Sequence, residues 1–106
     1  MDLLQAIQER HSVRVYTEQK IEDEKRQRLS ALIRECNEES GLHIQIRYDD
    51  PNGFESKLAH YGSFRNVNNY IILAGKTSDS LQEKCGYYGE KIVLEAQRLG
   101  LNTCWV

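Results

Sequence analysis

The sequence is poor in the features that mark disordered, secreted or membrane proteins. It has one proline and seven glycines in 106 residues, too few for long disordered linkers. No apolar run approaches the roughly 20 residues needed to cross a bilayer, and no basic segment followed by an apolar stretch opens the chain. These absences predict a folded, cytoplasmic protein without a membrane partner.

Cysteines and histidines are too scattered to indicate a disulfide framework or a metal site. The cysteines are odd in number and contain no Cys-x-x-Cys pair, and the histidines lack metal-ligand spacing. The residues concerned are Cys36, Cys85, Cys104, His11, His43 and His60. We therefore expect reduced thiols and no bound metal.

Charge and composition favour one small globular body over a nucleic-acid-binding protein. The formal net charge is −2, whereas duplex binding requires a clustered cationic face. Hydrophobic residues make up 40% of the chain and charged residues 28%, close to globular averages. We expect a single domain over residues 1–106 and no nucleic-acid partner.

Three segments have the apolar spacing of amphipathic helices. The first covers residues 2–9 with Asp2 as its cap, and the second runs from about 22 to 39 and ends at Gly41. The third follows a capping box formed by Ser80 and Glu83 and ends at Gly100. The predicted apolar stripes are Leu3, Leu4 and Ile7; Leu29, Leu32, Ile33 and Cys36; and Cys85, Tyr88, Gly89, Ile92, Val93, Ala96 and Leu99.

The remaining segments predict strands and turns. Residues 42–48 alternate apolar and polar side chains, as in a strand with one buried face. Residues 49–53 predict a turn and residues 54–58 a single helical turn. The apolar run 69–76 predicts a strand at the centre of the sheet, and residues 102–106 predict the start of another. This order indicates an α+β fold with an antiparallel or mixed sheet and packed helices.

The last predicted strand ends in TCWV, which is apolar and has no element after it. Domains tend to close with a tied-down element or a polar tail. We therefore interpret the domain as truncated at its carboxyl-terminal end. A strand without its neighbour leaves backbone groups unpaired, so we expect a homodimer, with strand exchange as one route to it.

The segment Glu9 to Arg14, ERHSVR, is the clearest chemical motif. It supplies two guanidinium groups, an imidazole and a hydroxyl where a helix gives way to extended chain, a combination that suits a phosphate. Alternation along an extended run points Arg10, Ser12 and Arg14 to one side. On spacing alone, the favoured interpretation is a solvated helix end with Arg10 interacting with the helix dipole.

This motif resembles the opening signature of nitroreductase-family flavoproteins, in which RHSVR follows a short amphipathic helix. Farther along, GYYGEKIVLEAQRLGLNTCWV resembles the family's long central helix and succeeding strand, and NYIILAGK resembles the strand before them. The wording YYGE resembles a branch of short nitroreductases. Together these stretches cover most of the chain in the family's order, so the resemblance implies the amino-terminal part of an FMN-dependent nitroreductase-like fold.

The resemblance also implies a cofactor site. Arg10 and Ser12 would bind the FMN phosphate with His11 beside it, and Arg14 would reach the pyrimidine edge of the ring. A cation at that edge would stabilise negative charge on the reduced flavin. Better-known members carry a proline-, serine- and asparagine-rich stretch after the second helix that this chain lacks. The loop after residue 60 offers Ser63, Arg65, Asn68 and Asn69 as replacements, or as an ordinary polar loop.

The function so implied is an FMN-dependent oxidoreductase that passes electrons from NAD(P)H through flavin to a small-molecule acceptor such as a nitroaromatic or a quinone. The flavin does the chemistry, so no catalytic side chain is assigned. Two alternatives stay open. One is a non-catalytic flavin-binding or dimerising module, and the other is an α+β interaction domain with a basic surface patch.

Overall fold

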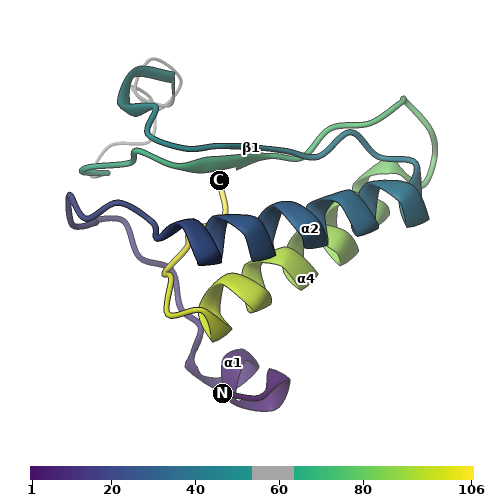
Figure 1. Ribbon diagram of the computed structural model, residues 1–106. Coiled ribbons are helices and arrows are strands. Elements are labelled where there is room, and N and C mark those ends of the chain that lie inside the picture. The colour runs from purple at the N-terminus through teal and green to yellow at the C-terminus, as the bar shows by residue number, and fades with distance from the viewer. Residues whose placement is uncertain (54–63) are drawn as a thin grey trace.

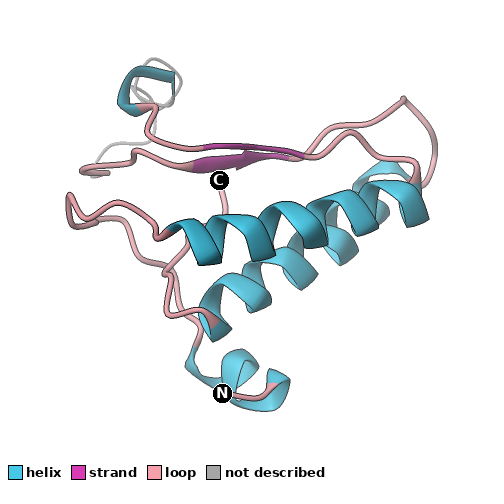
Figure 2. Cartoon of the chain, viewed as in Figure 1, coloured by secondary structure: helices cyan, strands magenta, loops and turns pink. Residues whose placement is uncertain are grey.

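The computed structural model describes residues 1–53 and 64–106 and shows a small α+β fold. The elements follow one another as α1 (Leu3–Glu9), α2 (Asp23–Ser40), β1 (Gln45–Arg47), β2 (Tyr70–Ile72) and α4 (Leu81–Arg98). The long helices α2 and α4 lie side by side below the β1–β2 sheet, and α1 lies at the far side of α4 (Figures 1 and 2). The predicted fold class is confirmed to this extent.

Helix α1 begins as the sequence predicts, but it buries a different residue. Asp2 accepts a hydrogen bond from the Gln5 amide, and the Gln5 side chain returns one from the Asp2 amide, which completes a capping box. Ala6 is the buried residue of the helix, whereas Leu3, Leu4 and Ile7 are 52%, 68% and 55% exposed. The helix therefore packs through a small residue and leaves its predicted apolar stripe uncovered in the described chain.

The core forms between α2, α4 and the inner face of the sheet. The predicted stripe of α2 is confirmed, since Leu29, Ile33 and Cys36 are buried and Leu32 packs against them. The stripe of α4 is also confirmed around Ile92, and Leu94 is an additional buried residue that the spacing rule missed. Both helices end at glycines in the left-handed conformation, Gly41 with φ 77° and Gly100 with φ 81°, as predicted.

The sheet is antiparallel and has two strands in the described residues. Ile46 pairs with Ile71, and both pack on the core, while Arg47 pairs with Tyr70 on the same ladder. The strand predicted over residues 69–76 forms over Tyr70–Ile72, but in the described chain it pairs with β1 alone and is not central. β2 pairs with β1 on one edge, and its residues also line a cavity, so the apolar run did not identify a second neighbouring strand.

The turn predicted over residues 49–53 is wrong at its end, because residues 51–53 are helical. Pro51 starts a helical turn, and the Asp50 carboxylate accepts the Gly53 amide at 3.1 Å. An Asp-Pro pair is suited to this role, because aspartate caps a helix start and proline has no amide to leave unpaired at the first helical position. The helical turn predicted at residues 54–58 lies outside the described residues.

The capping box predicted at the start of α4 does not form. Ser80 precedes the helix, but its backbone has ψ 4° rather than the extended value of a usual cap, and its side chain caps no amide. The hydroxyl instead lies 3.4 Å from that of Ser78. A turn at residues 79–80 leads into the helix, so the sequence pattern was right about the start and wrong about the cap.

The carboxyl-terminal residues contact the fold without forming the predicted strand. Thr103 makes an isolated parallel bridge with Ser12, and Trp105 donates its ring N–H to Glu90 at 3.0 Å. The Trp105 ring lies against Gly89 of α4, where an added Cβ would sit 2.6 Å from Cη2 of the indole and 2.9 Å from Leu73. Gly89 therefore provides the space that the ring occupies.

Two glycines of α4 give a matched test of this packing. Gly86→Ala adds a methyl group to open space and should stabilise the helix by about 1 kcal/mol. Gly89→Ala should come out about 1–3 kcal/mol less stable than Gly86→Ala, because its methyl group collides with Trp105 and Leu73. Chemical denaturation measures the difference, and fluorescence of the single tryptophan should change only in Gly89→Ala. Equal stability of the two variants would contradict this packing.

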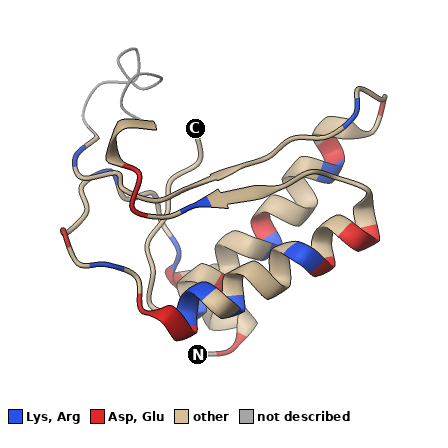
Figure 3. Cartoon of the chain, turned by 45° about the horizontal axis from the view of Figure 1, so that its top comes forward, with Lys and Arg blue, Asp and Glu red and all other residues tan. Residues whose placement is uncertain are grey.

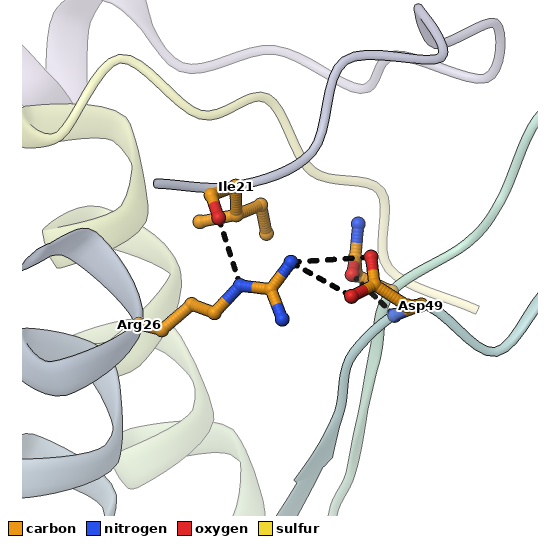
Figure 4. Close-up of polar contacts among 4 residues, drawn as sticks. Ile21, Arg26 and Asp49 are labelled. Atoms are coloured by element: carbon orange, nitrogen blue, oxygen red, sulfur yellow. Dashed lines mark hydrogen bonds and ion pairs between the residues drawn. The ribbon is translucent and has the colours of Figure 1, made fainter. Parts of the chain in front are cut away.

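The Arg26 side chain connects the start of α2 to the residues that follow β1 (Figure 4). Arg26 donates from Nε to the Ile21 carbonyl at 2.8 Å, and its Nη2 lies 3.0 Å from the Asp49 carboxylate. The same guanidinium stacks 4.8 Å above the centre of the Tyr48 ring. Asp49 has φ 53° and its amide is bonded by Asn69, so this bend is fixed from both sides.

Acidic and basic positions are interspersed along the two long helices (Figure 3). Such mixed patterning agrees with the small net charge of −2. Within residues 1–53 and 64–106, no helix combines the length and apolar character that crossing a bilayer requires.

Candidate functional site

The segment that follows α1 lies between two distant parts of the chain. The Val13 amide donates to the Thr103 carbonyl at 3.0 Å. Farther along the segment, the Arg65 amide donates to the Arg14 carbonyl at 2.9 Å, and the Tyr16 amide donates to the Arg65 carbonyl at 3.1 Å. The predicted extended conformation is thus held by backbone bonds on both sides, which fixes the direction in which each side chain leaves the segment.

Arg10 is the most constrained of the predicted cofactor residues. Its amide closes α1 by donating to Ala6, and its Nε donates to the Thr103 hydroxyl at 3.2 Å. Its Nη2 is buried and has no hydrogen-bond partner among the described residues. A buried guanidinium nitrogen normally has an acceptor, so this atom is suited to binding an anionic oxygen.

The other three predicted residues are more exposed. His11 makes a ring contact from Nδ1 to the Glu9 carbonyl at 3.0 Å. Ser12 takes part in the bridge to Thr103, and Arg14 pairs with residue 65 through its backbone. His11, Ser12 and Arg14 are all exposed at the surface, within four residues of Arg10 in the sequence.

The pKa of the Tyr16 hydroxyl is affected by both Arg10 and Arg14. Burial raises the pKa of Tyr16 to about 12, with a further rise from the Cys104 thiol, while Arg10 and Arg14 oppose it. The hydroxyl donates to the Val13 carbonyl, which closes a tight loop over residues 13–16. The positive charges of both arginines therefore lie within electrostatic range of this hydroxyl.

The raised pKa of Tyr16 makes stability depend on pH in the alkaline range. An unfolded tyrosine ionises near 10, whereas the folded one stays neutral up to about 12, so the neutral hydroxyl stabilises the fold fully below about pH 10. This contribution should be lost as the pH rises from about 10 to 12. Subtracting the phenolate absorbance titration of Tyr16→Phe from that of the wild type should leave one tyrosine with a midpoint near 12. A difference midpoint near 10 would refute the burial of this hydroxyl.

Of the loop residues predicted to complete the pocket, Arg65 is brought to the segment through its backbone. Asn68 bonds through its carbonyl to Asp50, and the Asn69 side chain accepts the Asp49 amide, so both serve the bend after β1. Ser63 lies outside the described residues. Sequence reasoning missed Asn66, whose side-chain amide donates to the Tyr16 carbonyl at 2.9 Å and which has φ 59°.

A cavity of about 650 Å³ adjoins this segment. Tyr16, Thr17, Cys104 and Trp105 line it, and Ile71 and Ile72 of β2 supply apolar surface. Its size and mixed lining are those of small-ligand sites. Residues 10–14 are not among the described residues that line it, and the lining begins at Val15, the next residue of the chain.

No group of three or more His, Cys, Asp and Glu side chains is placed to hold a metal ion in residues 1–53 and 64–106. The cysteines are free thiols, and burial raises the pKa of Cys36, which makes that thiol a poor nucleophile at neutral pH.

Comparison of the sequence with known families gives a match over nearly the whole chain. A family described as "Putative TM nitroreductase" matches residues 2–106, which include both the Arg10–Arg14 segment and Thr103. The chain belongs to this nitroreductase family. No curated protein and no solved structure matches it. For this nitroreductase-family chain, the resemblance drawn from RHSVR and the TCWV segment is therefore confirmed at the level of the family.

Proposed function

We propose that the chain is an FMN-dependent oxidoreductase that takes electrons from NAD(P)H and passes them to a small acceptor such as a nitroaromatic or a quinone. The observation that carries the proposal is the environment of the Arg10 side chain. In a chain of the nitroreductase family, its buried Nη2 has no acceptor among the described residues, although its Nε is bonded to Thr103. A phosphate oxygen supplies the acceptor that this geometry calls for.

The residues fit FMN by the chemistry of their donors. Arg10 would bind the phosphate with the Ser12 hydroxyl, and His11 lies beside them at the exposed end of the segment. Arg14 would lie at the pyrimidine edge, where its fixed positive charge favours added negative charge on the ring. The cavity lined by Tyr16, Cys104 and Trp105 is large enough for a flat aromatic group.

When bound, FMN would supply the redox chemistry, accepting a hydride from NAD(P)H and releasing electrons to the acceptor. The chain's own residues would bind the phosphate, orient the ring and shield it from water on one side. We therefore assign no catalytic acid, base or nucleophile. We further propose that the protein acts in the cytoplasm.

Homodimerisation is part of the proposal and is supported by α1. The apolar face of α1 is more than half exposed at each of its three residues, Leu3, Leu4 and Ile7. Exposed apolar patches of this kind often mark a surface that binds another protein chain. Replacing Leu4, the most exposed of the three, with lysine should weaken association without lowering monomer stability. Sedimentation equilibrium of wild type and Leu4→Lys tests this, and a wild type that stays monomeric at all concentrations would contradict it.

The decisive experiment measures absorbance between about 350 and 500 nm after incubation with FMN and removal of free flavin. Yellow protein that oxidises NADH or NADPH in the presence of a quinone or nitroaromatic supports the proposal. Yellow protein without turnover favours a non-catalytic flavin-binding module. Colourless protein at saturating FMN overturns the flavin assignment.

A further inference from the structure

Thr103 holds the candidate segment through both its backbone and its side chain. Its carbonyl oxygen accepts the Val13 amide at 3.0 Å, and its hydroxyl accepts Arg10 Nε at 3.2 Å. It is also the bridge partner of Ser12. One residue close to the carboxyl terminus thus anchors the backbone and the key side chain of a segment more than 80 residues away in sequence.

The side-chain bond determines where the rest of the guanidinium points. An arginine has several rotatable bonds but a rigid planar head, so fixing Nε fixes the plane and the direction of both terminal nitrogens. The backbone end of the same side chain is already held, because the Arg10 amide closes α1 on Ala6. Nη2 is left buried and without a partner in the described chain, in a direction set by Thr103.

We propose that Thr103 is a positioning residue, which orients Arg10 for an anionic phosphate without touching the ligand itself. The proposal rests on the proposed flavin function. Its physical basis is preorganisation. A free arginine loses rotamer freedom when it binds an anion, whereas an arginine already held by the Thr103 hydroxyl loses less. The hydroxyl is the part of Thr103 that does this, since its carbonyl bond to Val13 is independent of the side chain.

Two substitutions separate the hydroxyl from the shape of the residue. Thr103→Val keeps the branched side chain and the backbone bond but removes the acceptor, and Thr103→Ser keeps the acceptor. FMN dissociation constants should rise about 3- to 10-fold in Thr103→Val and stay within about twofold in Thr103→Ser. In an Arg10→Ala background, Thr103→Val should add nothing. A loss of the same size in that background, or no rescue by serine, would overturn the proposal.

A ligand-free measurement keeps the inference separate from the flavin assignment. In the wild type, the Arg10 Nε–H proton should exchange with water more slowly than that of exposed Arg34, as followed by nitrogen-edited proton NMR. Thr103→Val should abolish the difference and Thr103→Ser should preserve it. Equal exchange of Arg10 and Arg34 in the wild type refutes the positioning role, even if FMN binds. Slow Arg10 exchange in a protein that binds no FMN leaves the contact intact and refutes the proposed function instead.

Discussion

Replacing Ile92 with alanine is expected to lower the free energy of unfolding by about 2–5 kcal/mol. Ile92 is fully buried and, with Cys36, has one of the largest fully buried side chains in the part of the chain that the structure describes. It lies in the cluster that joins α4 to Leu29 and Ile33 of α2 and to Ile44. Removing three carbons loses their transfer free energy and leaves a cavity that two long helices cannot close easily. Domains of this size typically have about 5–15 kcal/mol of stability in total, so the loss is a large share.

Ile7→Ala provides the matched control for Ile92→Ala. It is the same chemical change in a helix, but Ile7 is 55% exposed in the single chain, so at protein concentrations low enough to keep the protein monomeric its cost should stay within about 0.5 kcal/mol. Urea denaturation followed by far-ultraviolet circular dichroism measures both variants, and Ile92→Val should fall between them at about 0.5–1.5 kcal/mol. If the two alanine variants lose equal stability, the core does not lie where α2 and α4 meet.

The helices could be predicted because their determinants are local. The cap at Asp2, the apolar stripe of α2 and the left-handed glycines at positions 41 and 100 each depend on residues within a turn or two. The strands could not be predicted as well. The apolar run around Ile71 indicates burial but does not say what buries it, and a pairing partner is a distant residue. The same limit applies to residues 102–106, where one bridge forms in place of a strand.

The candidate site divides in the same way. Arg10 and Arg14 were found from a contiguous motif, because residue type and alternation suffice to propose an anion-binding segment. Thr103 and Asn66 were not, since a threonine and an asparagine in a loop carry no signal of their own. Their roles arise from contacts that span 93 and 50 residues. Family resemblance located the segment, and the three-dimensional structure supplied the residues that hold it.

Arg10 also shows a conflict between stability and binding. A buried donor without a partner costs about 1–3 kcal/mol, so Nη2 does not stabilise the fold in the absence of a ligand. The hydrogen bond from its Nε to Thr103, by contrast, stabilises the folded state. These two contributions nearly offset each other, and Arg10→Ala should therefore change the denaturation midpoint little without flavin. Strained or unsatisfied groups of this kind are typical of binding sites.

Arg10→Ala should weaken FMN binding by about 1–3 kcal/mol, which corresponds to roughly 5- to 150-fold in the dissociation constant. The reason is loss of a charged hydrogen bond to phosphate from an arginine already oriented by Thr103. Quenching of flavin fluorescence measures the affinity, with exposed Arg34→Ala as the control that should bind normally.

Riboflavin, which lacks the phosphate, separates the roles assigned to the two arginines. If Arg10 binds phosphate, Arg10→Ala should leave riboflavin affinity unchanged while weakening FMN. If Arg14 binds the pyrimidine edge, Arg14→Ala should weaken both ligands to a similar degree, because both contain the same ring. An Arg10→Ala variant that loses riboflavin and FMN affinity equally would place that guanidinium at the ring and remove it from the phosphate. Among the described residues, Arg10 is the one with a buried side-chain nitrogen that lacks a hydrogen-bond partner. Unchanged affinity for FMN in both variants would therefore exclude the segment from the flavin site.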